Sequence, residues 1–161
     1  MRFVAAACAC LTLSTALMAQ APTPPPQTDR TKATHFSAAD LQAAFAKLPG
    51  DRPASSVRVF SLAPYNVNVE RRLPQAQGAS LHEAQAELFY VIEGSGTMLT
   101  GGTIPGATRN GTNLAGKTIE GGTRIAFKAG DFIMVPSGVA HQFVDLASPV
   151  HVMSMYLADG K

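Results

Sequence analysis

The chain has 161 residues, of which 46% are hydrophobic and 15% charged, and its formal net charge is +2. This composition suffices for one domain with a single core and excludes an intrinsically disordered chain. The 13 Lys and Arg residues are scattered along the chain, so nothing in the sequence supports a nucleic-acid-binding surface.

The N-terminal segment has the features of a secretory leader. A single arginine precedes an uncharged run of apolar and small residues, 3–18, which is too short to cross a membrane. We therefore expect a signal peptide over residues 1–19 and a periplasmic or secreted protein that leaves the membrane after cleavage. An uncleaved helical anchor is the alternative. Cys8 and Cys10 both lie in this segment, so the mature chain would have no disulfide.

A short linker and one helix are expected next. Residues 20–34 are rich in proline and polar side chains, which predicts a disordered linker before a domain at 35–161. Ser37 is a good N-cap for a helix, and Asp40, three residues later, is placed to complete a capping box. The apolar face of this helix would be formed by Leu41, Phe45 and Leu48.

Beyond the helix the hydrophobic pattern changes to a period of two. Short apolar or alternating segments separated by Gly and Pro turns predict an all-β sandwich or barrel. These segments are 57–61, 67–73, 88–92, 97–100, 124–127, 132–135, 142–146 and 150–157. Strand 57–73 is the candidate edge for pairing into a homodimer. The Gly-rich stretch 101–122 is either a lid or a hairpin extension.

Three ionisable residues lie next to the predicted core strands. Glu87 would share an inward face with Phe89 and Val91, because side chains alternate across a strand. His82 ends the segment before Glu87, and His141 opens a later strand, so each of the three is expected near a strand start. Two imidazoles and one carboxylate suit a divalent transition metal. A buried set of polar side chains that hydrogen-bond to one another is the alternative.

Two blocks of the sequence resemble the two motifs of the cupin superfamily, over about residues 57–157. In the first block, four residues separate His82 from Glu87 and six separate Glu87 from Gly94, as in the family motif. The second block keeps every spacing of its glycines, proline and histidine, with an aspartate in place of the motif asparagine; its residues are Gly130, Pro136, Gly138, His141 and Asp145.

This resemblance implies an antiparallel jelly-roll (cupin) barrel that carries a metal inside, preceded here by one short helix. It assigns the ligands as His82, Glu87 and His141. The first histidine of the family motif is replaced by Ser80, which leaves a set of two histidines and one carboxylate. We expect a divalent ion of Fe, Mn, Ni or Zn. A cupin that has lost its metal is the alternative, and Glu83 or Gln85 could supply a fourth ligand.

Further residues have both a functional and a structural interpretation. A substrate pocket would be lined by Ser80, Phe89, Met98 and Phe143, although core packing is the better explanation of the apolar members. Asp145 would orient a ligand histidine or occupy a surface turn. Arg71, Arg72 and Arg124 could bind an acidic substrate, but solvated strand faces explain them more simply. His35 and His151 have no identifiable partner.

Two functions follow from these observations. The first is a metal-dependent enzyme of dioxygenase or isomerase type, acting on a small organic molecule. The second is a non-catalytic cupin that binds a small molecule or a glycan, which the serine at position 80 favours.

Overall fold

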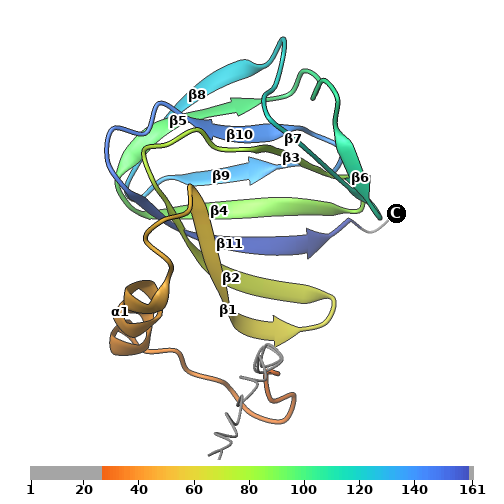
Figure 1. Ribbon diagram of the computed structural model, residues 1–161. Helices are drawn as coiled ribbons and strands as arrows, with labels where there is room; N and C mark the ends of the chain where they lie inside the picture. Colours follow the sequence, from red (N-terminus) through yellow and green to blue (C-terminus); the bar gives the residue numbers. More distant parts are fainter. Residues whose placement is uncertain (1–26, 160–161) are drawn as a thin grey trace, which may run out of the picture.

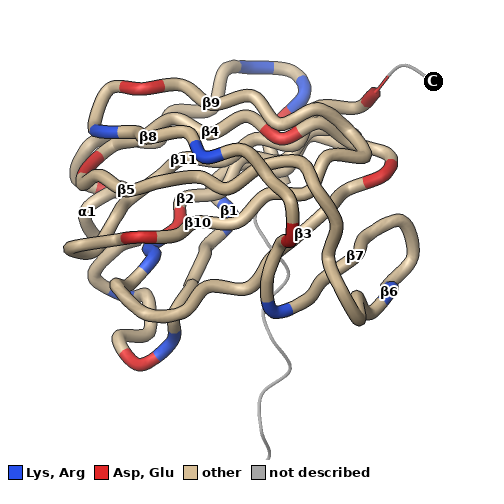
Figure 2. Tube along the Cα trace, turned by 90° about the horizontal axis from the view of Figure 1, so that it is seen from above, with Lys and Arg blue, Asp and Glu red and all other residues tan. Residues whose placement is uncertain are grey.

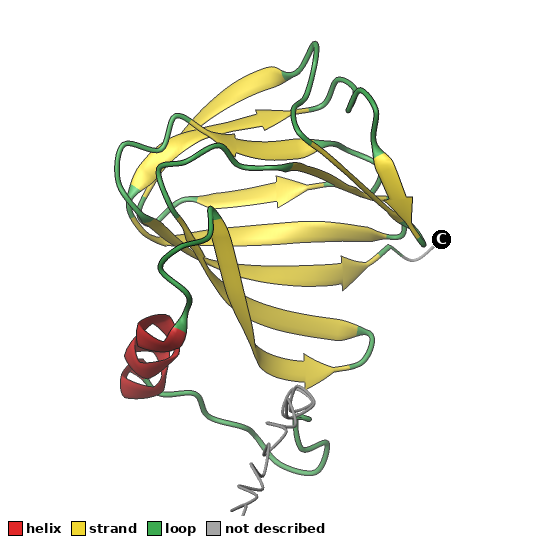
Figure 3. Cartoon of the chain, in the orientation of Figure 1, coloured by secondary structure: helices red, strands yellow, loops and turns green. Residues whose placement is uncertain are grey.

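The computed structural model describes residues 27–159 and shows two antiparallel β-sheets with one helix beside them (Figures 1 and 3). The leader predicted at 1–19 lies outside these residues. Within residues 27–159, no helix is long and apolar enough to cross a membrane. In the view of Figure 2, acidic and basic positions alternate around the molecule and most of the trace is uncharged.

The eleven strands of the described residues pair only in antiparallel fashion. The first sheet has the order β1-β2-β11-β4-β9, and the second β6-β7-β3-β10-β5-β8. The strands are β1 (Ala54–Leu62), β2 (Tyr65–Arg72), β3 (Ala79–His82), β4 (Gln85–Glu93), β5 (Ser95–Thr100), β6 (Thr108–Asn110), β7 (Asn113–Gly116), β8 (Thr123–Lys128), β9 (Phe132–Val135), β10 (His141–Val144) and β11 (Val150–Ala158). This arrangement confirms the predicted all-β fold class.

The helix α1 (Ala38–Lys47) begins as the sequence predicted. The Ser37 hydroxyl accepts a hydrogen bond from the backbone N–H of Asp40 at 3.1 Å, and the Asp40 carboxylate accepts one from the backbone N–H of Ser37 at 2.9 Å. This reciprocal pair is a capping box, which satisfies two backbone donors that a helix start otherwise leaves unpaired.

The helix covers the outer face of the first sheet. Its residues Phe45 and Leu48 are buried together with Val59 and Val69 of β1 and β2. The opposite face of β2 carries the polar side chains Asn68, Glu70 and Arg72. Because the outer face of β2 is already covered by α1, this polar face lies inside the barrel rather than in solvent.

Residues 27–34, within the segment predicted to be a linker, run beside β1. The backbone N–H of Thr28 donates to the carbonyl of Ser61 at 2.9 Å, and the Thr28 hydroxyl accepts from the backbone N–H of Ser61 at 3.1 Å. These bonds cover part of the outer edge of β1, which is the end strand of its sheet.

The main core lies between the two sheets. It is formed by Phe89, Val91, Met98, Phe127, Ile133, Val135, Phe143, Leu146, Val150 and Val152, each at most 9% exposed. The alternation predicted for β4 is confirmed: Glu87, Phe89 and Val91 are buried, whereas the residues between them are only half-buried.

The segment 101–122, for which sequence left open a lid or a hairpin, contains the two-stranded hairpin β6–β7. Strand β7 pairs with β3 along its whole length, and His82 lies opposite Asn113. The hairpin is therefore an extension of the second sheet that reaches the end of β3.

Candidate metal centre

Three side chains from three strands converge inside the barrel. His82 is the last residue of β3, Glu87 lies in β4, and His141 is the first residue of β10. The prediction that all three lie at strand starts was wrong for His82, because β3 ends where the chain bends into β4. Ser80 lies opposite His141 in the β3–β10 pair, which brings the two histidine-bearing strands together.

The turn before β10 holds the two sequence blocks together. The backbone N–H of Gly138 donates to the carbonyl of His82 at 2.8 Å. Gly138 has a φ of 76°, in the left-handed region that glycine adopts without a steric penalty. A glycine at this position therefore allows the turn to place His141 beside His82.

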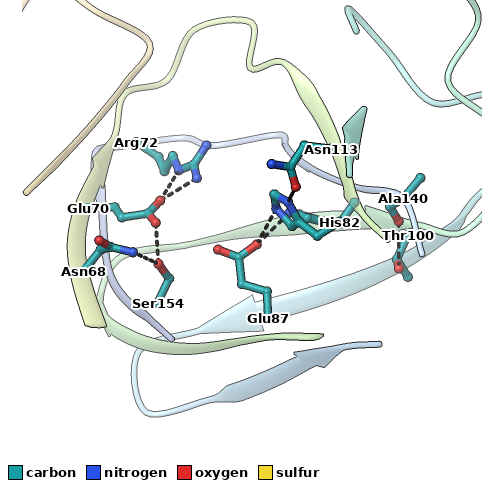
Figure 4. A network of polar contacts seen from close by, with 10 residues as sticks. Asn68, Glu70, Arg72, His82, Glu87, Thr100, Asn113, Ala140 and Ser154 are labelled. Atoms are coloured by element: carbon teal, nitrogen blue, oxygen red, sulfur yellow. Dashed lines mark hydrogen bonds and ion pairs between the residues drawn. The ribbon is translucent and has the colours of Figure 1, made fainter. Parts of the chain in front are cut away.

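The geometry centres on one carboxylate oxygen. Oε2 of Glu87 lies 3.2 Å from Nε2 of His82 and 3.1 Å from Nε2 of His141. Potential ligand atoms of these three residues all lie within 4.8 Å of one another. Figure 4 shows Glu87 directed at His82, which is labelled there. The Glu87 side chain is 3% exposed and that of His141 is 5% exposed, so the three groups meet in a desolvated space.

These distances fit a bound transition metal. Two ligand atoms that each lie about 2.1 Å from an ion, at a right angle to somewhat more, are about 3.0–3.4 Å apart. The two nitrogen–oxygen distances fall in this range. The donor set of two imidazoles and one carboxylate suits a divalent first-row metal and leaves coordination positions open.

Asn113 fixes the orientation of the His82 ring. Its side-chain oxygen lies 2.7 Å from Nδ1 of His82. Because that oxygen can only accept, Nδ1 of His82 carries a proton, and a neutral ring has its Nε2 lone pair free for a metal ion. Without an ion, a protonated His82 ring donates from Nε2 to Glu87. Outer partners of this kind hold ligand histidines in the tautomer that a metal requires.

The three groups shift one another's pKa in the metal-free protein. Burial by itself raises the pKa of Glu87, but hydrogen bonds from His141 and His82 outweigh burial and lower this pKa to about 2. Burial lowers the pKa of His82, but its hydrogen bonds with Glu87 and Asn113 and the nearby carboxylates raise it above its usual value.

Tyr156 of β11 lies beside the three groups. It is the register partner of Glu87, and its ring meets that of His82 edge-on, with centroids 5.1 Å apart. Burial, together with the charges of Glu87 and Glu70, raises the pKa of the Tyr156 hydroxyl far above its usual range. The phenol therefore keeps its proton at neutral pH and can act as a hydrogen-bond donor.

Other residues singled out from the sequence lie as follows. Phe89 and Met98 are fully buried in the main core, and Phe143 is 2% exposed there. Phe89 also lies against the ring of His141, with centroids 5.8 Å apart. Asp145 lies at the surface, where its carboxylate is 61% exposed and pairs with Arg124.

The remaining candidates face away from the centre. The exposed carboxylate of Glu83 forms two hydrogen bonds with Arg109, at 2.6 and 2.8 Å. His151 stacks on Phe45 and contacts Glu93, on the outer side of the first sheet. Neither residue is placed to join His82, Glu87 and His141.

Sequence reasoning missed Asn113, Tyr156 and Glu70, and it assigned Arg72 to a solvated strand face. Asn113 lies in a Gly-rich hairpin without an alternating pattern, and the polar face of β2 was interpreted as solvated. Alternation did offer one signal: Val67 and Val69 form an apolar face, so the other face of β2 was free to point inward.

No family model and no curated protein sequence matches the chain. Among solved structures, KdgF from a Halomonas species is 13% identical with a TM-score of 0.56, over 80% of this chain and 96% of KdgF. TT1209 from Thermus thermophilus is 19% identical with a TM-score of 0.54, over 74% of this chain and 94% of that one.

A third solved structure, that of Fe(II) HppE, is 15% identical with a TM-score of 0.52, over 70% of this chain and 57% of that one. At these identities the likeness concerns the fold alone. The structural neighbours are cupin proteins. This chain accordingly has a cupin-like sandwich of two antiparallel sheets, with a candidate metal site of His82, Glu87 and His141 in its interior.

Proposed function

We propose that this chain is an exported, metal-dependent cupin that acts on a small organic molecule. One observation carries the proposal: the Nε2 atoms of two histidines lie 3.1 and 3.2 Å from a single buried carboxylate oxygen of Glu87. Export rests on the leader-like residues 1–19.

Each residue of the site has a defined part in this proposal. His82, Glu87 and His141 hold the ion, and Asn113 keeps His82 in the required tautomer. Tyr156 stays protonated, and its hydroxyl forms a hydrogen bond with Glu87, which helps to orient that carboxylate. The fully buried Phe89 excludes water from one side. A bound divalent ion would supply Lewis acidity or redox chemistry, which suits an isomerase or a dioxygenase type of reaction.

Elemental analysis of the full-length protein, purified without a histidine tag, tests this function. We expect about one equivalent of Fe, Mn, Ni or Zn per chain. Because one structural neighbour is an Fe(II) protein by its description, Fe(II) is the first ion to add back to chelator-treated protein. A metal-free preparation whose unfolding temperature does not change with any of the four ions would contradict the proposal.

The alternative function is a non-catalytic binding protein. Ser80 lies opposite His141, where the family resemblance calls for another histidine, so the donor set has one imidazole fewer. Under this alternative, the barrel binds its small-molecule ligand without an ion. Ligand binding that is unchanged by a strong chelator would favour it.

A further inference from the structure

A second pair of charged side chains faces the candidate metal centre across the barrel interior. Glu70 and Arg72 lie on the inward face of β2, and Figure 4 shows both on the other side of the interior from Glu87 and His82. The side chain of Glu70 is 6% exposed and that of Arg72 is 19% exposed. A carboxylate and a guanidinium are costly to bury, and the metal site proposed above does not use either of them.

Both oxygens of Glu70 already have partners. Oε1 accepts a hydrogen bond from the Ser154 hydroxyl at 2.6 Å. Oε2 accepts two from Arg72, from Nε at 3.1 Å and from Nη2 at 2.5 Å. Glu70 is therefore saturated, and its effect is to orient the guanidinium. The ring of Phe143 lies 4.8 Å from the guanidinium carbon and supports it from another side.

The guanidinium keeps one nitrogen for a ligand. Among the described residues no group accepts a hydrogen bond from Nη1 of Arg72. A pocket of about 180 Å³ adjoins this residue, lined by Ala54, Ser55, Ser56, Glu70, Arg72 and Tyr156. Tyr156 belongs to both sites, since it also lies against His82. A small molecule in this pocket would therefore contact Arg72 and would be adjacent to the candidate metal centre through Tyr156.

The charge balance favours an anion. With neutral histidines, the carboxylates of Glu70 and Glu87 offset a divalent ion, which leaves the single positive charge of Arg72. A guanidinium held in a fixed orientation suits a planar carboxylate better than a neutral group. Because the pocket is small, the matching ligand is a small organic acid.

We propose that Arg72 is the substrate-binding residue of this barrel and that it binds the carboxylate of a small organic acid beside the metal site. The proposal rests on the proposed function in one respect, because the charge balance counts the divalent ion. Glu70 acts as a positioning residue, because it touches Arg72 and not the pocket's ligand-binding nitrogen.

The test measures the binding of acetate, lactate and pyruvate to Mn(II)-loaded and to metal-free full-length protein by calorimetry. Lactamide serves as the uncharged counterpart of lactate. The variants are Arg72→Gln and the double variant Glu70→Gln/Arg72→Gln, which removes both charges and leaves no unpaired carboxylate. Arg124→Gln is the matched control, because Arg124 is an arginine at the surface. Metal content is measured separately for every protein.

We expect at least one of the three acids to bind, and its Kd to rise tenfold or more in both Arg72 variants with unchanged metal content. Arg124→Gln should bind as the wild type does, and lactamide should bind at least tenfold more weakly than lactate. If Arg72→Gln fails to fold, the acid affinity of the double variant is compared with that of the wild type instead. Equal acid binding by wild type and double variant, or no binding of any acid to the wild type, would overturn the proposal.

The metal measurement separates this inference from the proposed function. If the wild type takes up no ion, the metal-dependent function fails. The comparison of metal-free wild type with the Arg72 variants then still decides whether Arg72 binds the acid. An acid affinity at least tenfold weaker in the Arg72 variants supports the assignment of Arg72, and an equal affinity refutes it.

Discussion

The two ends of the barrel interior are built by the same strands and differ completely in chemistry. In β4, Glu87 belongs to the candidate metal centre, whereas Phe89 and Val91 belong to the core. In β10, His141 belongs to the candidate metal centre and Phe143 belongs to the core. Because only every second side chain of a strand enters the barrel, successive inward positions are two residues apart. In both strands, one such step leads from the candidate metal centre to the close-packed core.

Hydrogen bonds between strands explain how polar side chains can be buried inside this barrel. Most buried polar groups in the interior have a partner on a neighbouring strand, as with His82 and Asn113 or Glu70 and Ser154. Among the described residues of the centre, Nδ1 of His141 is a buried exception. The core end supplies the packing that holds those strands in place. The two ends should therefore respond differently to mutation, in binding at the polar end and in stability at the core.

The largest effect is expected for His141→Ala, which removes one of two imidazole ligands. Metal content, measured by elemental analysis after purification without a tag, should fall from about one equivalent to below detection. His151→Ala is the matched control, since His151 lies outside the barrel against Phe45. Retention of a full equivalent by His141→Ala would show that the ligands are assigned wrongly.

Met98→Ala probes the core end. Met98 is fully buried, so the cavity left by truncation should lower the free energy of unfolding by about 2–5 kcal/mol. Metal content should stay at the wild-type level. Met134→Ala, at a position that is 51% exposed, should change stability by less than about 0.5 kcal/mol. A loss of ligand binding without a loss of stability in Met98→Ala would favour a pocket role instead.

The charge on Glu87 should make the metal-free protein sensitive to acid. Folding lowers the pKa of Glu87 from 4.5 to about 2, so its carboxylate contributes stability above pH 4.5 that is lost as the pH falls toward 2. At about 1.4 kcal/mol per pK unit, this contribution is about 3 kcal/mol.

Urea unfolding between pH 2 and 7 measures this contribution of Glu87. The contribution is the difference between wild type and Glu87→Gln in how the free energy of unfolding changes with pH. Glu120→Gln, at an exposed position, should keep the wild-type slope. His82 acts in the opposite direction: its raised pKa adds stability below pH 6.5 that is lost as the pH rises through the folded value. Equal slopes for wild type and Glu87→Gln would mean that the histidines do not contact this carboxylate.

The smallest effect is expected for Asn113→Ala, which leaves all three ligands in place. Loss of the hydrogen bond to Nδ1 of His82 should weaken metal affinity about 10- to 100-fold, the usual effect of removing such a partner. Competition with a chelator of known affinity measures this change. Asn110→Ala in the same hairpin is the control. An unchanged affinity in Asn113→Ala would mean that the hairpin has no influence on the polar end.

The sequence predicted the fold and the three ligands because both depend on local signals. Alternation located most strands, the residues around Ser37 located the helix, and the resemblance to the two cupin motifs pointed to the candidate metal site. Asn113, Glu70 and Arg72 depend on long-range register instead. Alternation in β2 separates an apolar face from a polar one, but the polar face lies inside because α1 covers the apolar face, and that contact is not visible within β2.

The hydrogen bond from Gly138 to His82 joins segments that are distant along the chain. Closing the chain between them costs conformational entropy, which opposes early formation of this contact. A refolding chain should therefore acquire its affinity for an ion only when the two sheets have come together. The rate of metal uptake would then report the rate at which the barrel closes. Stopped-flow refolding with a chromophoric ion such as Co²⁺ would measure it.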